Sequence, residues 1–542
     1  MKIVLFYACD IKDRHNYYLS MMPINFAALG AYLESKKHKV TMINFSKIDK
    51  TAGMKKLTSG SPDLIITTMF SHNRFETIRL VRELKKNNPR YKIAVSGPLA
   101  TFLVNGILER WTEVDFILRD EPESSVEFLL EKLSSGKNFP EKVFQGQRIK
   151  NLSKIVPPPF FSGDSLGIDH NEQYKFLMSS RGVLNANRYF TSPEYRDNKI
   201  IFRTPDEMVR QIDFIYKKYG IVYFSIKDDN FTVKKDRVID FCRKLRKKHL
   251  YLMWNCKSRP EMLDEEMLVE MKLAGLERIL LTVNTGSVKL LDSYDSEMKT
   301  EDILRATALI RKTGIYYSEI ITVGYPDETK SDINHTKRII KQTLPGNVII
   351  MKAIYFPGSF GYESAKLKGI IDDSVWFKAK DSIITVNSDE TDLKAKFEDI
   401  RNTAGLVREG AWYKEKDFKN HHRVLARQCW VTDILEGDYY MDEENHAEAE
   451  KSYRRVISAF PKNPWGYLRQ GKVKFRLGDF AGAQDYYHKV TELVPNFYGG
   501  WLKMSESEIA EGNRKKAKSS IEKAYSLNRF DHRIHNIKTL LK

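Results

Sequence analysis

Apolar and amphipathic segments alternate along residues 1–145. Each continuous apolar run is typical of a strand buried on both faces of a parallel sheet, and each is followed by a segment with one apolar helical face. The runs are KIVLFY (2–7), KVTMINF (39–45), DLIITTMF (63–70), YKIAVSG (91–97) and DFILRD (115–120). This order predicts an α/β domain built on a doubly wound parallel sheet.

The alternation resumes with longer units over residues 171–375, after a connector over 146–170 that contains three consecutive prolines. The predicted strands are YKFLMSS (174–180), IVYFSIKDD (221–229), YLMWNCKS (251–258), RILLTVNTG (278–286), YSEIITVGY (317–325) and NVIIMKAIYF (347–356). Consecutive βα units of this length indicate a full or partial (β/α) TIM-type barrel. The chemistry of such a barrel lies at the carboxyl ends of its strands.

A 34-residue period marks the last hundred residues, which follow a helical connector over 376–435. The recurring positions are Ala449, Ala483 and Ala517, together with Tyr453, Tyr487 and Ile521. Small residues inside helix pairs at this interval resemble the tetratricopeptide repeat. Residues 436–542 are therefore predicted to be all-α repeats with a concave face for a protein partner. We expect the preceding residues to fold without them.

Length and charge narrow the class of protein. A chain of 542 residues is long enough for several domains. The formal charge is +18, but the densest basic run (234–250) has the spacing of an amphipathic helix with a solvated face, and no interleaved aromatics suggest base stacking. Nucleic-acid binding is therefore not indicated.

Cysteine usage and hydropathy bear on location. The four cysteines are far apart in sequence, which indicates neither a disulfide framework nor a zinc knuckle and fits a reducing compartment. No apolar run approaches the roughly 18 residues of a membrane span. These features predict a cytoplasmic protein without a membrane span.

Several ordered segments resemble one known family. They include SGPLAT (96–101), RDEPES (119–124), IKDDNFT (226–232), VGYPDET (323–329) and YFPGSFGYESAKLKGII (355–371). In this order they are similar to cobalamin-binding-domain radical S-adenosylmethionine enzymes, over about residues 1–375. The resemblance implies cobalamin and S-adenosylmethionine as candidate cofactors, and it leaves open whether either is bound.

The cysteine motif of that family is missing from this chain. In the family, a CxxxCxxC loop after the first barrel strand ligates a four-iron four-sulfur cluster through three thiolates. The corresponding positions hold Val183, Asn187 and Phe190, and no other cysteine is near in sequence. We therefore expect no iron–sulfur cluster and assign no metal ligands.

The resemblance also implies candidate binding residues in the barrel. Asp228, Asp229 and Asn230 end the second strand, where the family contacts the methionine end of S-adenosylmethionine; capping of the following helix is an equal alternative. Asn284 stands where the family often has Glu. Gly324 is placed to line the adenine or merely to form a turn.

The first domain offers its own candidates at the carboxyl ends of its strands. For the nucleotide tail of cobalamin these are Ser71, Asn73, Ser96, Gly97 and Thr101. His72 lies close to the expected corrin, but a lone histidine there is more often a hydrogen-bonded loop residue.

Three hypotheses of function follow. In the first, the protein is a degenerate family member that binds a cofactor or ligand without radical chemistry. The second is a non-catalytic scaffold or adaptor that acts through its repeats. In the third, the protein is a cobalamin-dependent methyltransferase. Catalytic residues are not assigned.

Overall fold

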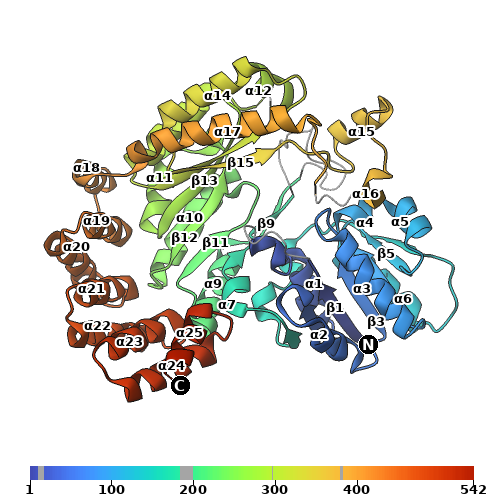
Figure 1. The fold of residues 1–542 in the computed structure, drawn as a ribbon, viewed down its shortest axis with the longest axis horizontal. Coiled ribbons are helices and arrows are strands. Elements are labelled where there is room, and N and C mark those ends of the chain that lie inside the picture. Colours follow the sequence, from blue (N-terminus) through green and yellow to red (C-terminus); the bar gives the residue numbers. More distant parts are fainter. Residues whose placement is uncertain (10–16, 183–198, 296, 379–382, 542) are drawn as a thin grey trace.

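The computed structural model describes residues 1–9, 17–182, 199–295, 297–378 and 383–541. A parallel sheet with helices on both faces is followed by an open barrel and then by an arc of paired helices (Figure 1). The predicted fold class is therefore confirmed. None of the described helices has both the length and the apolar content needed to cross a bilayer.

The first sheet has seven parallel strands among the described residues, in the order β6-β5-β4-β3-β1-β2-β7. They are β1 (Lys2–Tyr7), β2 (Lys39–Asn44), β3 (Leu64–Thr68), β4 (Ile93–Ser96), β5 (Phe116–Arg119), β6 (Val143–Gln145) and β7 (Asp164–Leu166). The covering helices are α1 (Ile24–Ser35), α2 (Lys50–Thr58), α3 (Arg74–Asn87), α4 (Pro98–Phe102), α5 (Val104–Arg110) and α6 (Pro122–Ser134). Along β1, Val4 and Phe6 enter one apolar core and Leu5 and Tyr7 enter another. Because strand side chains alternate in direction, the sheet carries a core on each face.

Two edge strands of this sheet were not predicted. β6 and β7 have three residues each and are partly exposed, so they lack the apolar run that marks the central strands. β7 comes from the predicted 146–170 connector and pairs parallel with β2. That connector thus contributes to the first sheet as well as leading to the barrel.

The barrel is an open sheet of six parallel strands, in the order β15-β14-β13-β12-β11-β8 among the described residues. They are β8 (Phe176–Leu177), β11 (Tyr223–Ile226), β12 (Met253–Ser258), β13 (Leu276–Asn284), β14 (Tyr316–Val323) and β15 (Asn347–Lys352). The helices are α7 (His170–Tyr174), α9 (Pro205–Tyr219), α10 (Lys235–Lys247), α11 (Glu265–Leu273), α12 (Val288–Tyr294), α13 (Thr300–Lys312) and α14 (Lys330–Thr343). All six predicted strands are present, and the barrel is partial rather than closed.

The segment after the barrel returns to the first domain. It contains α15 (Phe360–Leu367) and α16 (Val375–Lys378), which lie beside α4 and α5 in Figure 1. Trp376 is fully buried there, and its carbonyl oxygen accepts a hydrogen bond from Arg74 Nε at 2.8 Å. The next helix, α17 (Glu390–Val407), packs on α14 and β15.

The repeats form three helix pairs and one further helix. They are α19 (Trp430–Asp442), α20 (His446–Ala459), α21 (Pro464–Arg476), α22 (Phe480–Leu493), α23 (Tyr498–Ala510), α24 (Arg514–Leu527) and α25 (His532–Leu540), preceded by α18 (Glu415–Leu425). Ala449, Ala483 and Ala517 are fully buried, as the 34-residue period predicted. Helices approach closely at these positions because alanine has a small side chain.

The repeats dock on the end of the barrel at which its strands begin. Residues from both sides form one apolar cluster, which we call the floor cluster. Its buried members are Val222, Met253, Leu273, Tyr413, Phe418, Leu425, Cys429, Trp430, Val431, Ile434, Leu435, Met441, Ala449, Tyr453, Val456, Trp465, Val473 and Val494. Trp465 Nε1 also donates to Tyr251 O at 3.0 Å. The barrel and the repeats thus share a core, which argues against the expectation that the preceding residues fold without the repeats.

A backbone contact fixes the second repeat against α9. Gly220 ends α9 with a φ of 63°, and a Cβ at this position would lie 2.1 Å from the carbonyl carbon of Asn496. Asn496 Nδ2 also donates to Lys217 O at 2.8 Å. Only glycine permits this approach, which sets the position of the repeats relative to the barrel.

Candidate functional site

A cavity of about 310 Å³ lies between the two parallel sheets, at the carboxyl ends of strands from both. We call it the interdomain cavity. From the first domain it is lined by Pro23, Ile24, Asn25, Phe26, Thr68, Phe70, Ser96, Gly97, Pro98, Asp120, Glu121 and Pro122, and from the barrel by Met178, Ser180, Arg181, Gly182, Lys227, Asp228 and Asp229. Of the predicted binding residues, Ser96, Gly97, Asp228 and Asp229 are therefore in its wall. The carboxyl ends of parallel strands are where α/β folds bind their ligands.

The turn after β4 brings backbone rather than side chains to the cavity. Ser96 Oγ donates to Thr67 O at 3.1 Å, so this hydroxyl is used within the sheet. Gly97 has a φ of 97°, and a Cβ there would lie 2.5 Å from Thr68 Oγ1. Glycine is therefore required for the turn to pack on β3, and it leaves a wall without a side chain.

The turn after β3 is held together by its own side chains. His72 Nε2 lies 2.9 Å from Tyr7 Oη, and the imidazole stacks on Phe70. Burial lowers the pKa of His72 to about 4, so this ring is neutral near pH 7. Asn73 Oδ1 accepts from Phe70 N at 2.7 Å, and its amide donates to Thr68 O. Ser71, His72 and Asn73 are outside the lining of the cavity, which agrees with the hydrogen-bonded loop role for His72.

Thr101 also supports the wall from behind. Its Oγ1 accepts a hydrogen bond from Asp120 N at 3.1 Å, and the residue is buried. Asp120 has a φ of 63° and is itself in the cavity wall. Thr101 thus stabilises a strained turn rather than contacting the cavity.

On the barrel side, Asp228 holds the start of the loop that leads to Val183. The backbone N–H groups of Ser179 and Ser180 donate to Asp228 Oδ1 at 2.7 and 3.1 Å, and the Ser179 hydroxyl donates to Oδ2. Asp228 is 3% exposed, and burial raises the pKa of its carboxyl. Its hydrogen-bonding capacity is largely used by this loop.

The two residues after Asp228 have different roles. Asn230 Oδ1 accepts from Thr232 N at 3.3 Å and from Thr232 Oγ1 at 2.9 Å, so it caps the short helix Phe231–Val233. This is the capping alternative that the sequence offered. Asp229 is exposed in the cavity wall.

Asn284 and Gly324 lie away from the cavity lining. Asn284 has a φ of 62°, and its amide donates to Asp295 Oδ2 at 3.0 Å. Gly324 N donates to Glu328 Oε2 at 2.8 Å, and a Cβ there would lie 2.8 Å from Leu393. Both residues therefore shape loops of the barrel.

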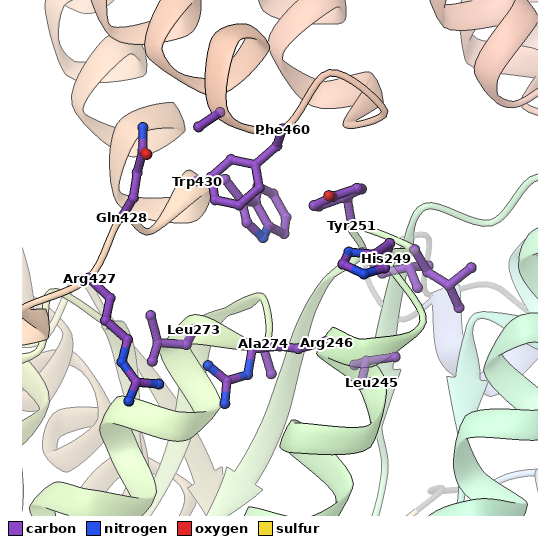
Figure 2. Close-up of a pocket in the computed structure, with 13 residues that line it drawn as sticks. Leu245, Arg246, His249, Tyr251, Leu273, Ala274, Arg427, Gln428, Trp430 and Phe460 are labelled. Carbon is purple, nitrogen blue, oxygen red and sulfur yellow. The ribbon is translucent and has the colours of Figure 1, made fainter.

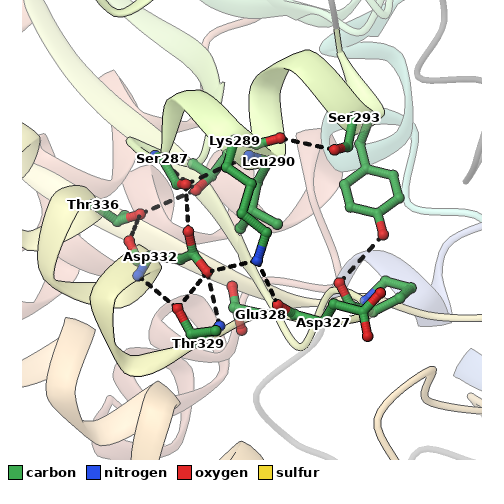
Figure 3. A network of polar contacts seen from close by, with 12 residues as sticks. Ser287, Lys289, Leu290, Ser293, Asp327, Glu328, Thr329, Asp332 and Thr336 are labelled. Atoms are coloured by element: carbon green, nitrogen blue, oxygen red, sulfur yellow. Dashed lines mark hydrogen bonds and ion pairs between the residues drawn. The ribbon is translucent and has the colours of Figure 1, made fainter.

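A polar network pins the loops after β13 and β14 to each other (Figure 3). Ser287 Oγ donates to Asp332 Oδ1 at 2.6 Å, and Lys289 Nζ donates to Asp327 O at 2.8 Å. Thr329 Oγ1 donates to Asp332 Oδ2. Because these groups satisfy one another, this part of the barrel rim is a fixed wall.

An ion pair that the sequence did not reveal joins the two domains across the cavity. Arg181 Nη1 lies 2.6 Å from Glu121 Oε2, and Nη2 lies 2.9 Å from Glu123 Oε1. The side chain of Glu123 is 1% exposed and that of Arg181 is 10% exposed. The segments RDEPES and SSRG contain these residues, but their pairing depends on the domain arrangement.

The four cysteines lie in three separate apolar cores. Val183, Asn187 and Phe190 lie outside the described residues, but all four cysteines of the chain are described and buried. Cys9 belongs to the first domain, Cys242 and Cys256 to the barrel core, and Cys429 to the floor cluster. Burial raises the thiol pKa of Cys242 and Cys256. Three thiolates are therefore not brought together in the described part of the chain.

One group of three metal-ligating side chains occurs among the described residues, on α18 and on the first repeat helix, α19. It consists of His422, Asp433 and Glu436. Arg455 Nε donates to Asp433 Oδ1 at 2.7 Å and Nη2 pairs with Glu436. The carboxylates thus already face a cation, and the group is an ion-pair network.

Comparison with protein families agrees with this layout. A B12 binding domain model matches residues 14–130, and a Radical SAM superfamily model matches residues 186–340. Tetratricopeptide repeat models match residues 434–463 and 466–496. The chain joins a B12-binding domain, a radical SAM domain and tetratricopeptide repeats. The interdomain cavity therefore lies between the B12-binding domain and the radical SAM domain.

The relatives found by sequence comparison have low sequence identity to this chain. An uncharacterized methyltransferase of Pyrococcus horikoshii is 21% identical over 374 residues, which cover 66% of this chain and 81% of that protein. The anaerobic magnesium-protoporphyrin IX monomethyl ester cyclase of Rubrivivax gelatinosus is 23% identical over 328 residues. This match covers 56% of this chain and 58% of the cyclase, so the chain spans little more than half of that relative.

Solved structures share the fold. The radical S-adenosylmethionine methyltransferase TsrM from Kitasatospora setae, solved with cobalamin and a [4Fe-4S] cluster, aligns with a TM-score of 0.56 and 16% identity over 67% of this chain and 78% of TsrM. The cobalamin-dependent enzyme OxsB, with aqua-cobalamin and S-adenosylmethionine bound, aligns with a TM-score of 0.54 and 16% identity over 100% of this chain and 83% of OxsB. At these identities the likeness is one of fold.

Proposed function

We propose that this protein binds cobalamin in the interdomain cavity and works without an iron–sulfur cluster. The observation that carries the proposal is the contrast between two parts of one site. The B12-binding domain and the barrel enclose a cavity at the carboxyl ends of their strands, whereas all four cysteines are buried in cores elsewhere.

The residues of the cavity suit contact with part of a corrinoid, which is larger than 310 Å³ and would extend beyond the cavity. Gly97 presents backbone in the cavity wall after β4, and Phe70 offers an apolar ring in the same wall. His72 Nε2 is engaged by Tyr7 Oη, so we propose that His72 is not a cobalt ligand. Bound cobalamin would supply a metal centre able to carry a methyl group, and the protein would orient it between two domains tied by Arg181.

The residues do not fit a [4Fe-4S] cluster. Iron in such clusters is held by thiolates, and the chain has no cysteine at the three expected positions. We therefore assign no radical step to this protein. Without a cluster, S-adenosylmethionine would have to be bound by side chains of the cavity wall, such as Asp229.

A cobalamin-dependent methyltransferase is the enzymatic form of this proposal. It is supported by the methyltransferase named among the relatives and by the fold shared with TsrM. Methyl transfer between a bound cobalamin and a nucleophile does not require a cluster electron, so the missing cysteines do not oppose it.

A scaffold acting through the repeats is a second candidate. The repeats contain a groove of about 380 Å³ between α21, α22, α23 and α25. Lys472 and Arg476 line this groove from one face of α21, and neither has an ion-pair partner within the described ranges. These cations favour an acidic segment of a protein partner.

Cofactor content tests the proposal. The protein is purified anaerobically and incubated with hydroxocobalamin, and cobalt, iron and sulfide are then assayed with a visible spectrum of the same sample. We expect about one cobalt per chain, and iron and sulfide at background. Absence of both cobalt and iron would favour the scaffold. Iron together with sulfide would contradict the cluster-free proposal.

A pair of variants locates the site. Asn25 is exposed in the cavity wall at the second position of α1, and Asn105 is exposed at the second position of α5, outside the cavity lining. Asn25→Trp should block the cavity and lower bound cobalt at least fivefold, whereas Asn105→Trp should retain it. Equal cobalt in both variants would place the cofactor elsewhere.

A further inference from the structure

A second cavity lies between the barrel and the first repeat. We call it the floor cavity; its volume is about 330 Å³. It lies at the end of the barrel where β12 begins, between the end of α10 and the start of α19 (Figure 2). The interdomain cavity lies at the opposite ends of the barrel strands, so the two sites are separate.

Three aromatic rings form one wall of the floor cavity. The rings of Tyr251 and Trp430 are 6.2 Å apart at 85°, and those of Tyr251 and Phe460 are 5.7 Å apart at 63°. Trp430 is 5% exposed, so its position is fixed by packing. Edge-to-face rings of this kind present a rigid apolar surface to a planar group.

Two arginines face this wall. Figure 2 shows the guanidinium groups of Arg246 and Arg427 on the barrel side of the cavity, across from Trp430 and Phe460. Arg246 Nη2 donates to Glu270 Oε2 at 2.6 Å, while its Nη1 makes no hydrogen bond to a described residue. Arg427 makes no side-chain hydrogen bond or ion pair to any described residue. The two guanidinium groups therefore have N–H donors available to a ligand in the cavity.

The turn between α10 and β12 is strained where it borders the cavity. His249 and Tyr251 have φ values of 53° and 48°, a region that non-glycine residues rarely occupy. The Tyr251 carbonyl is held by Trp465 Nε1 at 3.0 Å, so the repeats keep the turn in this conformation. Strain of this kind concentrates at ligand sites.

We propose that the floor cavity binds a small organic anion with a planar apolar body, such as an aromatic carboxylate, sulfonate or phosphate ester. The planar body would pack against Tyr251, Trp430 and Phe460, whose rings are not parallel and so offer it both faces and edges. The anionic group would accept hydrogen bonds from Arg427 and from Arg246, whose planar guanidinium groups match such oxygens. The volume falls in the range of about 300–1,000 Å³ that is usual for small-molecule sites. Arg427, which has no ion-pair partner among the described residues, would repel a cation at the same place.

Calorimetric titration of the full-length protein with naphthalene-2-sulfonate tests this proposal. The neutral naphthalene-2-sulfonamide, which has the same ring system, is the matched ligand. No cobalamin is added, because the cavities are separate. We expect one site for the sulfonate and binding of the sulfonamide that is weaker by about tenfold or more, as loss of charged hydrogen bonds predicts.

Two arginine variants test whether naphthalene-2-sulfonate binds in the floor cavity. Arg427→Glu reverses the charge at the cavity, while Arg423→Glu makes the same change at another exposed arginine, on α18 and outside the cavity lining. We expect Arg427→Glu to raise the dissociation constant of the sulfonate at least tenfold and Arg423→Glu to leave it within about twofold. Absence of sulfonate binding by the wild type, equal binding of both ligands, or equal effects of both variants would overturn the proposal.

Discussion

At the residue scale, Asp228 anchors the start of the loop that leads to Val183. Three donors of Ser179 and Ser180 converge on its carboxylate, which is buried. The sequence placed this residue at the right strand end, but its geometry makes it a positioning group for the loop. Ser96, Gly97 and Asp229 are the other predicted residues found in the cavity wall, and the rest support turns behind it or elsewhere. Strand ends can be read from a sequence, whereas the direction of a polar side chain depends on tertiary neighbours.

Asp228→Asn should therefore destabilise the protein. The amide keeps the shape but loses the charge and replaces one acceptor with a donor that faces other donors, which costs about 2 kcal/mol. Urea denaturation at pH 7 measures the change. Asp292→Asn, at an exposed position of α12, is the control and should change stability by less than about 0.5 kcal/mol. Equal effects would mean that Asp228 does not anchor the loop.

Glu319 on β14 gives stability a dependence on pH. It is fully buried, and burial raises its pKa from 4.5 to about 7, against the opposing effect of Thr343. The folded state therefore holds this proton more tightly than the unfolded state does. Its contribution is fully present below pH 4.5 and is lost as the pH rises to about 7.

Glu319→Gln removes this titration. At pH 8 the variant should be more stable than the wild type by about 3 kcal/mol, and the difference should shrink at pH 5, because each unit of pKa shift corresponds to about 1.4 kcal/mol. Denaturation midpoints at the two pH values provide the measurement. A difference independent of pH would show that Glu319 does not titrate as described.

At the element scale, the central strands were predicted and the edge strands were not. β1 and β3 carry long apolar runs because both faces of each strand are covered. β6 and β7 are short and partly exposed, so no periodic signal distinguishes them from loop. The repeat helices were predicted from their period, but their contact with the barrel is carried by scattered residues such as Trp430 and Trp465, which no local pattern marks.

The loop after β8 offers a prediction of its own. Val183→Cys, Asn187→Cys and Phe190→Cys restore the CxxxCxxC spacing, next to an anchor at Asp228 that is intact. We expect anaerobic reconstitution with iron and sulfide to give the broad visible absorbance of a cluster. The triple serine variant controls for non-specific iron. Failure of the cysteine variant would mean that the cavity has lost more than its thiolates.

At the scale of the whole molecule, the repeats complete the barrel. A chain ending at residue 435 would cut α19 and expose Val222, Met253 and Leu273, whereas a chain ending at Phe497 retains every buried member of the floor cluster. The shorter chain should aggregate, and the longer one should remain monodisperse, because burial of each such side chain contributes about 1.5–3 kcal/mol. Size-exclusion chromatography with light scattering compares them. A monodisperse shorter chain would show that the barrel residues of the floor cluster can be exposed to solvent without aggregation.

The placement of the repeats has a consequence for any partner that they hold. The repeats cover the end of the barrel where its strands begin, and the interdomain cavity opens where the strands finish. A partner seated on the repeats is thus kept at the end of the barrel opposite the interdomain cavity. Such a partner would determine where in the cell the protein is held. The molecule acted upon would enter from the opposite end of the barrel, at the interdomain cavity.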